Sequence, residues 1–261
     1  MELLDRLSSS RVFDLAQPYF VGMPHYPTHP PFLFSLVKQH GEYTGPAGNS
    51  SAADAIGLGT HVGTHIDALC HFSCCGKLYG GAEVAGLQSY AGGVRQHSVD
   101  TVAPILRRGV LLDIAGRLGV EALPVDFEIT PAHLAEAERA AGVSIGKGDI
   151  VVLRTGWARY WEDAARYIAQ GSGPGPALAG AQWLSARGIY AAGSDTVGFE
   201  KLPDANMPVH VHLLVESGIH IIECLNLETL AAAGVGEFCF VALPLKIRGA
   251  TGSPIRPVAL V

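Results

Sequence analysis

The second half of the chain alternates short apolar runs with helical segments, and this alternation restricts the fold more than any other feature. The apolar runs, bounded by glycine, are typical of buried strands and cover residues 109–116, 148–157, 189–195, 219–225 and 238–249. Thr130 is suited to cap a helix that begins at Pro131 and ends at Gly142. Further helices are predicted at residues 157–171, 181–188 and 209–218. Strands that alternate with helices are typical of an α/β fold. Because no low-complexity linker interrupts them, we expect a single domain over residues 1–261.

The first hundred residues are less regular. Residues 19–34, "YFVGMPHYPTHPPFLF", are rich in proline and aromatic side chains, which disfavours a central helix or strand. We therefore expect an extended N-terminal arm or loop within residues 1–50. Its composition suits a lid or a contact with a second subunit, although ordinary connecting loops share that composition.

The composition argues against two classes of partner. Of the 261 residues, 48% are hydrophobic and 16% are charged, and the formal net charge is −6. Binding to nucleic acid or to an anionic membrane needs a basic patch, so we expect neither partner. No apolar run reaches the length that spans a bilayer, and the acidic N-terminus is not typical of a secretory signal. The cytoplasm is the expected location.

The five cysteines do not predict a disulfide framework, because their number is odd and no secretory signal precedes them. Three of them lie near His71, but their spacing is not the C-x2-C of structural zinc sites. We interpret the cysteines as small buried thiols in a reduced compartment: Cys70, Cys74, Cys75, Cys224 and Cys239.

Residues 60–72, "THVGTHIDALCHF", hold four ligand-type side chains, namely His61, His65, Asp67 and His71. Every separation among them is even, so on an extended strand all four would point to one face. On a helix Asp67 would lie around the cylinder from His61 and His65, and Gly63 would make a regular helix costly. The spacing therefore predicts an extended segment that directs four groups to one place.

Imidazole nitrogen together with carboxylate is a donor set suited to Zn²⁺, Mn²⁺ or Fe²⁺. Three protein ligands would leave coordination positions for water, which a catalytic ion needs. The alternative is that these histidines are separate residues, solvated or hydrogen-bonded in the core. Four ligand-type groups of matching parity favour the metal site over that alternative.

A second candidate site involves Glu223, which stands in the apolar run 219–225. On a strand it would share a face with isoleucine and leucine, where an unpaired carboxylate is costly or has a raised pKa. A metal ion would remove this cost, and so would a salt bridge to Arg154 or Arg248. Two further candidate ligands stand just upstream, at the start of a predicted helix: His210 and His212.

Together these segments resemble the metal-dependent cyclase family, which includes bacterial kynurenine formamidases, isatin hydrolases and manganese-dependent trans-dienelactone hydrolases. The specific motif is His-x-Gly-Thr-His-x-Asp-x-x-x-His at residues 61–71. The other matches follow in order along most of the chain: "DLAQPYFVGMPHYP", "VVLRTGW", "AAGSDTVGFE", "HLLVESGIHIIECLNLETL" and "LPLKIRGATGSPIRPVA". The resemblance implies a swivelling β/β/α domain with a mixed sheet core, assembled as a homodimer or homotetramer.

The resemblance also assigns roles to the candidate residues. It implies that His61, His65 and Asp67 hold a metal ion, Mn²⁺ or Zn²⁺, and that His71 is the general acid and base. In kynurenine formamidases the residues that match His210 and Glu223 help to hold a second ion, which the aspartate bridges. Isatin hydrolase-like members are described with a single manganese. The wording "PVH" favours His210 over His212 as the second-half ligand.

The resulting hypothesis is a metal-dependent hydrolase that opens a small cyclic or aryl amide, such as an isatin-like lactam, with metal-activated water. His71 would accept the proton of the water and return it to the leaving group. The alternatives are a kynurenine formamidase acting on N-formylkynurenine, a trans-dienelactone-type lactone hydrolase, and a non-catalytic metal- or ligand-binding protein on the same fold. Four aromatic residues are candidates to cover a planar substrate, although core packing would explain them equally well: Tyr19, Phe20, Tyr26 and Phe32.

Overall fold

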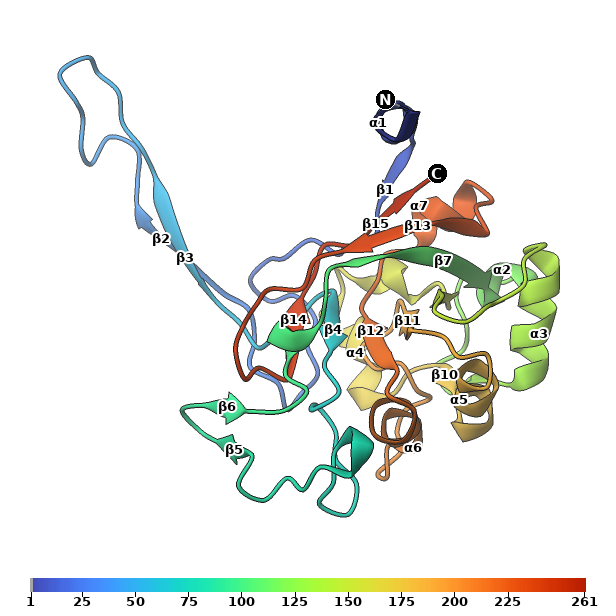
Figure 1. The fold of residues 1–261 in the computed structure, drawn as a ribbon. Helices are drawn as coiled ribbons and strands as arrows, with labels where there is room; N and C mark the ends of the chain where they lie inside the picture. Colours follow the sequence, from blue (N-terminus) through green and yellow to red (C-terminus); the bar gives the residue numbers. More distant parts are fainter. Residues whose placement is uncertain (1) are drawn as a thin grey trace.

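The computed structural model describes residues 2–261, which form an α/β fold around a nine-stranded mixed sheet (Figure 1). The central strands run parallel to one another: β7 (Ile105–Asp113), β9 (Ile150–Arg154), β11 (Ala191–Ser194) and β12 (His220–Glu223). Antiparallel strands extend both edges, with β13 (Glu237–Ala242), β15 (Val258–Leu260) and β1 (Val12–Asp14) beyond β7, and β4 (His65–Asp67) and β14 (Gly252–Pro254) beyond β12. The predicted α/β class with a mixed sheet core is confirmed.

Both faces are buried over Val110–Leu112 of β7 and over all of β9, which explains the apolar runs in these strands. In β7, Val110 and Leu112 pack on one face, in the same cluster as Leu134 of α3. Leu111 packs on the opposite face, in the same cluster as Leu230 of α7. The first face is covered by α2 (Ile114–Arg117), α3 (Pro131–Ala140), α5 (Leu178–Ser185), α6 (Pro208–His210) and the π-helical turn η5 (Val211–Ser217), and the second by α7 (Glu228–Ala232).

The helix predicted after Thr130 is confirmed. The Thr130 hydroxyl accepts a hydrogen bond from the backbone N–H of His133, and Pro131 occupies the first helical position of α3. The helix ends at Ala140, two residues before the predicted stop at Gly142. The helices predicted at 181–188 and 209–218 correspond to α5, which lies three residues earlier, and to α6 followed by η5.

The prediction of one amphipathic helix over residues 157–171 is wrong. The segment is divided into a 3-10 turn η3 (Trp157–Tyr160), a short helix α4 (Ala164–Ile168) and a second 3-10 turn η4 (Ala169–Gly171). Asp163 caps α4 by accepting a hydrogen bond from the backbone N–H of Arg166 at 3.1 Å. This cap starts a new helix where the predicted helix would have continued.

Two strand predictions are wrong at their ends. The strand predicted at 238–249 ends at Ala242, two residues before Pro244, which has no N–H to give to a ladder. The strand predicted at 109–116 begins earlier, at Ile105, and ends at Asp113. The Asp113 carboxylate accepts a hydrogen bond from the backbone N–H of Gly116 and so starts α2.

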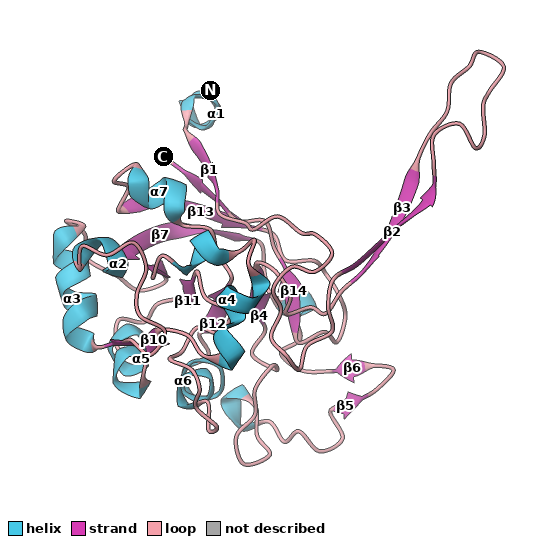
Figure 2. Ribbon diagram, turned by 180° about the vertical axis from the view of Figure 1, so that it is seen from behind, coloured by secondary structure: helices cyan, strands magenta, loops and turns pink. Residues whose placement is uncertain are grey.

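Two hairpins project from the body of the molecule (Figures 1 and 2). The longer one is a ribbon of β2 (Leu33–Lys38) and β3 (Ala53–Gly57), and the shorter one joins β5 (Gln88–Ser89) to β6 (Gly93–Val94). Residues 19–32, which precede the ribbon, form the loop that their composition predicts. The remaining elements are α1 (Glu2–Ser9), η1 (Tyr79–Gly81), η2 (Val99–Thr101), β8 (Glu128–Ile129) and β10 (Gly175–Pro176).

The cysteines differ from the prediction of buried thiols. Cys70 and Cys224 are buried, but Cys74, Cys75 and Cys239 are exposed, and all five are free. Across residues 2–261, no helix is both long enough and apolar enough to cross a membrane.

Candidate metal centre

Strands β4 and β12 bring the two predicted halves of the site together. They pair antiparallel, with His65 opposite Glu223 and Asp67 opposite Ile221. Directly opposed residues on antiparallel strands share a face, so the side chains of His65, Asp67 and Glu223 project to the same side of the sheet. Ile221 belongs to the cluster beneath the helices of that side. The site therefore lies under α6 and η5.

His61 and His71 reach this site from turns on either side of β4. The prediction of one extended segment over all four ligand-type residues is wrong, because only His65–Asp67 is a strand. Gly63 makes the first turn, with a φ of +69°, and a Cβ placed on it would lie 2.4 Å from the Tyr19 ring. Only glycine fits this position. The turn folds His61 back onto Asp67.

His61, His65 and Asp67 form a first donor group, whose ligand atoms all lie within 4.8 Å of one another. The His61 Nδ1 is 2.6 Å from the Asp67 Oδ1, and its Nε2 is 2.8 Å from the hydroxyl of Thr251. The His65 Nδ1–H donates to the carbonyl of Gly63 at 2.8 Å, which turns its Nε2 toward the carboxylates. Neither the His65 Nε2 nor the Asp67 Oδ2 has a hydrogen-bond partner within the described chain, although both atoms are buried.

Asp67 also belongs to a second donor group, with His210 and Glu223. The His210 Nε2 lies 3.4 Å from the Glu223 Oε1 and 3.9 Å from the Asp67 Oδ2. On its other side, the His210 Nδ1–H donates to the buried carboxylate of Glu200, which also accepts the backbone N–H groups of Val209 and His210. Glu200 therefore fixes the ring of His210 with its Nε2 toward the site.

His212 faces away from this centre. Its Nδ1 lies 2.7 Å from a carboxylate oxygen of the exposed Glu216, and its Nε2 lies 2.8 Å from the hydroxyl of Ser185. Arg154, proposed as a salt-bridge partner for Glu223, pairs with Asp113 and Glu228 instead.

The buried carboxylates of this cluster favour a positive charge beside them, either a metal ion or protonated histidines. Burial opposes protonation of His210, but hydrogen bonds to Glu200 and Glu223 outweigh it and raise the pKa of His210 to about 10. Burial likewise opposes protonation of His65, but the neighbouring Cys224 thiol, the Glu223 carboxylate 3.4 Å from its Nε2 and the charge of Asp67 raise its pKa well above the usual value. In the metal-free protein, protonation of His65 and His210 therefore neutralises the charge of the buried carboxylates. Together with the unpartnered Nε2 and Oδ2 atoms, the carboxylate and imidazole donors fit a divalent metal ion.

His71 stands beside the donor groups without belonging to either of them. Its ring stacks on His61, with ring centroids 3.9 Å apart and planes inclined by 26°. Burial lowers the pKa of His71 to about 3 despite the nearby charge of Asp67, so the ring is neutral at pH 7. A neutral imidazole next to the donor cluster is able to accept a proton.

A pocket of about 190 Å³ opens onto the donor cluster and includes His71, His210 and Glu223 in its wall. The rest of its lining is mainly apolar and aromatic: Tyr26, Thr28, His29, Phe72, Val197, Gly198, Leu202 and Met207. Such a pocket, apolar with a few converging polar groups, is typical of a site for a small planar molecule.

Of the four aromatic residues singled out in the sequence, Tyr26 lines this pocket and the other three lie beside it. Phe32, in the N-terminal segment, is buried in a core cluster that also contains Val197 and Leu202 of the pocket wall, and Tyr19 and Phe20 pack against the same cluster. The Tyr19 hydroxyl donates to the carbonyl of Val62 at 2.8 Å, which ties this segment to the turn before β4.

Three residues at the site were not singled out in the sequence. Glu200 ends "GSDTVGFE", a segment noted only for its family resemblance, and its signal is an acidic residue that directly follows Val197, Gly198 and Phe199. His29 lies in the proline-rich loop, with its ring centroid 5.3 Å from that of His61. Phe72 packs on His210 with ring centroids 4.8 Å apart. The contacts of all three are tertiary, and spacing along the chain does not show them.

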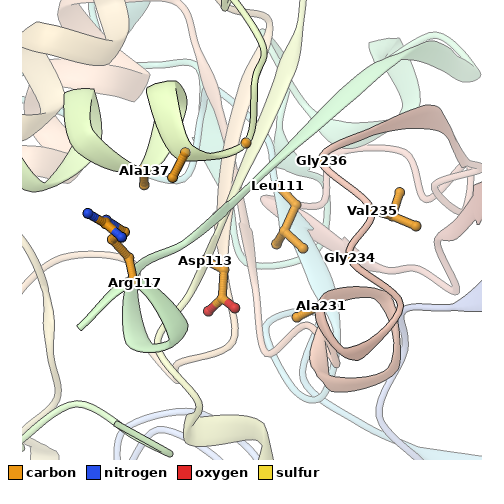
Figure 3. Close-up of a pocket in the computed structure, with 10 residues that line it drawn as sticks. Leu111, Asp113, Arg117, Ala137, Ala231, Gly234, Val235 and Gly236 are labelled. Carbon is orange, nitrogen blue, oxygen red and sulfur yellow. The ribbon is translucent and has the colours of Figure 1, made fainter. Parts of the chain in front are cut away.

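A separate pocket of about 230 Å³ lies between α3, β7 and the end of α7 (Figure 3). Its charged groups are already paired, because Asp113 binds Arg154 at 2.8 Å and Arg117 binds Glu136 at 2.7 Å. Small apolar residues such as Ala137 line the remainder. It offers no converging donor set among the residues described, so the histidine cluster is the candidate centre.

Comparison with known proteins agrees with this geometry. Residues 13–201 match the model of the Cyclase family. The chain belongs to this family. The resemblance seen in the sequence is therefore confirmed, and the histidine motif and the two donor groups lie in a cyclase-family protein.

Named relatives cover most of the chain. The kynurenine formamidase of Bacillus thuringiensis is 27% identical over 255 residues, which are 97% of this chain and 98% of its own. The isatin hydrolase of Roseibium aggregatum is 32% identical over 214 residues, 78% of this chain and 73% of its own. Among solved structures, one described as a novel cyclase has a TM-score of 0.89 and 30% identity, and covers 98% of this chain and 88% of its own. Isatin hydrolase A from Ralstonia solanacearum has a TM-score of 0.77 and 28% identity over 100% of this chain and 96% of its own.

Proposed function

We propose that this cyclase-family protein is a metal-dependent hydrolase that cleaves the amide bond of a small cyclic or aryl substrate, such as an isatin-like lactam. His61, His65 and Asp67 would hold one divalent ion, Mn²⁺ or Zn²⁺. His210 and Glu223, with Asp67 shared, would hold a second. A divalent ion in such a site polarises a carbonyl group and makes water acidic enough to act as a nucleophile near pH 7.

The observation that carries this proposal is that His71, which belongs to neither donor group, lines the pocket next to both of them. A protein that only binds a metal has no need of a proton acceptor there. The ring of His71 is stacked on His61 and lines the pocket, so it faces the place where a substrate carbonyl would lie. This favours catalysis over the non-catalytic alternative.

The protein residues have distinct tasks in this proposal. His71 accepts a proton from the attacking water at a ring nitrogen and donates it to the leaving nitrogen of the amide. Glu200 holds the Nδ1–H of His210 and so keeps that ring in one orientation. Phe72, Leu202 and Met207 form apolar walls that hold a planar ring and exclude bulk water from the reacting bond.

The substrate class is supported by the two groups of relatives. The isatin hydrolase is more similar over the residues it covers, at 32% identity, whereas the kynurenine formamidase matches along 97% of the chain at 27%. Both names describe hydrolysis of an amide bond, in a ring or in an aryl formamide. N-formylkynurenine is accordingly the second candidate substrate, and a trans-dienelactone-type lactone is the third.

The test is a screen of metal-free protein reloaded with Mn²⁺ or Zn²⁺ against isatin, N-formylkynurenine and trans-dienelactone. We expect hydrolysis of isatin that depends on added metal and is abolished by a chelator. Preferential turnover of another of the three compounds would replace the substrate assignment. Stoichiometric metal binding with no turnover of any of them would favour the non-catalytic alternative.

The β2–β3 ribbon supports the further proposal that the protein is a homodimer or homotetramer. Phe34 and Ile56 are paired across the ribbon and are 48% and 62% exposed, and the neighbouring Leu36 is 46% exposed. A two-stranded ribbon with exposed apolar residues is barely stable by itself in water, and a second copy of the chain would cover it. A groove of about 680 Å³, lined by the β5–β6 hairpin, Thr60 and Thr251, offers a surface for such a contact close to His61.

A further inference from the structure

Cys74 and Cys75 form an exposed pair of adjacent thiols, with their sulfur atoms 3.7 Å apart. They lie three and four residues after His71, in the loop that follows the histidine motif. The backbone of Cys75 is in the left-handed region, with a φ of +52°, which is unusual for a residue with a side chain. Neither thiol belongs to the donor groups of the metal centre.

We propose that Cys74 and Cys75 are a vicinal dithiol that a hydroperoxide oxidises to an intramolecular disulfide, and that this bond slows the reaction by distorting the Cys74–Lys77 turn and thereby displacing Phe72 and His71, which lie just before it. The effect on turnover rests on the proposed hydrolase function. The oxidation itself does not, because it depends only on the two thiols.

The chemistry needs one molecule of hydroperoxide per chain. The thiolate of Cys75 attacks the peroxide oxygen, which gives a sulfenic acid and releases an alcohol, or water from hydrogen peroxide. The sulfur of Cys74 then attacks the sulfenic sulfur, the S–S bond forms and a molecule of water leaves. We assign the second step to Cys74 because its hydrogen bond with Cys75 raises the pKa of the Cys74 thiol.

A disulfide between adjacent residues is strained. Neighbouring Cα atoms are about 3.8 Å apart, whereas disulfide-bonded residues are usually about 4.4–6.8 Å apart. A strained and exposed disulfide is reduced readily by other thiols. The modification would therefore be reversible, as a regulatory modification needs to be.

The dithiol is connected to the catalytic pocket through a short stretch of backbone. Backbone hydrogen bonds of 2.9 and 3.0 Å between Cys74 and Lys77 hold the present turn. Closing the disulfide ring must change the backbone angles of Cys74 and Cys75, and with them this turn. Only Ser73 separates Cys74 from Phe72, whose ring lies 5.1 Å from that of His71 and 4.8 Å from that of His210.

The first donor group precedes this turn and is fixed by the sheet. His65 and Asp67 lie on β4, between β12 and β14. We therefore expect oxidation to misplace His71 and Phe72 while the metal stays bound. A displacement of about 1 Å in a catalytic group reduces turnover substantially, up to about 100-fold.

The experiment treats metal-loaded protein with a small excess of hydrogen peroxide. Peptide mapping should find a disulfide within the peptide that contains Cys74 and Cys75, and turnover should fall by on the order of 10-fold or more. Metal content should be unchanged, and dithiothreitol should restore turnover. Cys74→Ser and Cys75→Ser should keep their activity under peroxide. The control variant Cys239→Ser removes another exposed thiol and should be inactivated like the wild type.

Three results would overturn the proposal: mapping that finds no disulfide at this pair, a disulfide that forms without loss of turnover, or inactivation of the two serine variants as fast as the wild type. Hydrogen exchange of residues 71–78 adds a readout that needs no substrate. If the disulfide forms and exchange in this segment changes while none of the candidate substrates is hydrolysed, the dithiol proposal stands and the function proposal fails.

Discussion

Replacement of Glu200 by glutamine tests whether this buried carboxylate sets the orientation of His210. The wild-type carboxylate accepts the backbone N–H of Val209 at 3.2 Å on one oxygen, and the backbone N–H of His210 at 3.1 Å on the other, together with the His210 Nδ1–H. A glutamine amide has only one oxygen. In either orientation its NH₂ group faces at least one backbone N–H donor.

The expected loss of stability follows from the number of N–H groups that lose their acceptor. One buried N–H left without an acceptor costs about 1–3 kcal/mol, so the free energy of unfolding of metal-free Glu200→Gln should fall by that amount. The melting temperature falls by roughly 2–4 °C for each kcal/mol in a chain of this size. Loss of the charged partner of His210 should also weaken the ion shared by Asp67, His210 and Glu223 by about 10- to 100-fold.

Thermal unfolding of the metal-free protein and calorimetric titration with Mn²⁺ or Zn²⁺ measure the two effects separately. Glu216→Gln is the matched control, because Glu216 also binds a histidine of the same helical segment, His212, but is exposed. It should change stability by less than about 0.5 kcal/mol and leave metal binding unaltered. If Glu200→Gln bound both ions as tightly as the wild type, Glu200 would not be the residue that orients His210.

Three further predictions concern the proton acceptor, the protons of the cluster and the assembly. His71→Ala should keep its metal and lose about 10²- to 10⁴-fold in kcat; a variant with full turnover would refute the acid–base role. Because the pKa values of His210 and His65 are raised, each ion should displace a proton on binding. The affinity for the ion held by His210, whose pKa is about 10, should weaken as pH falls below 10, and the affinity for the ion held by His65 should also weaken with falling pH. Titrations in buffers of different ionisation enthalpy measure this release, and heats independent of the buffer would contradict it. The double variant Phe34→Ser and Ile56→Ser should shift the mass in light scattering toward the 27.4 kDa of one chain, and an unchanged mass would exclude the ribbon as the contact.

Much of the central sheet follows from the sequence because its strands are buried on both faces. Residues such as Val151, Val152 and Leu153 need an apolar side chain whichever way they point, so β9 is visible as an unbroken apolar run. Glu223 was conspicuous for the same reason, as a carboxylate within such a run. The antiparallel pairing of β12 with β4 joins residues more than 150 positions apart, and no local pattern encodes that pairing.

The ribbon and the broken helix escaped prediction for other reasons. Ala53–Gly57 has the sequence "ADAIG", in which alanine, aspartate and glycine are all depleted in strands, so propensity argues against β3. Its pairing with Leu33–Lys38 overrides that preference. In residues 157–171 the helical periodicity is real, but the cap at Asp163 and the indole of Trp157, which donates to the carbonyl of Leu123 at 3.0 Å, interrupt the helix.

The sequence predicts part of the candidate site, namely the histidine motif, but not how its residues come together. The even spacing of the histidine motif drew attention to the residues that do lie together, but the structure brings them together by turns at Gly63 and after Ala68 rather than by one long strand. The sequence does not predict a role for Glu200, because Glu200 orients His210 only when the fold places α6 beside it. Sequence spacing reports neighbours along one element, whereas the partner that orients a ligand usually comes from another.

The presence of Asp67 in both donor groups has a consequence for how metal would be taken up. A single carboxylate would supply charge to two divalent cations, and the first ion to bind would repel the second. We therefore expect negative cooperativity, with a dissociation constant for the second ion above that for the first. Occupancy would then follow the supply of metal, with one ion per chain when metal is scarce and two when it is abundant. Turnover measured against free metal concentration should accordingly rise in two phases if both ions contribute.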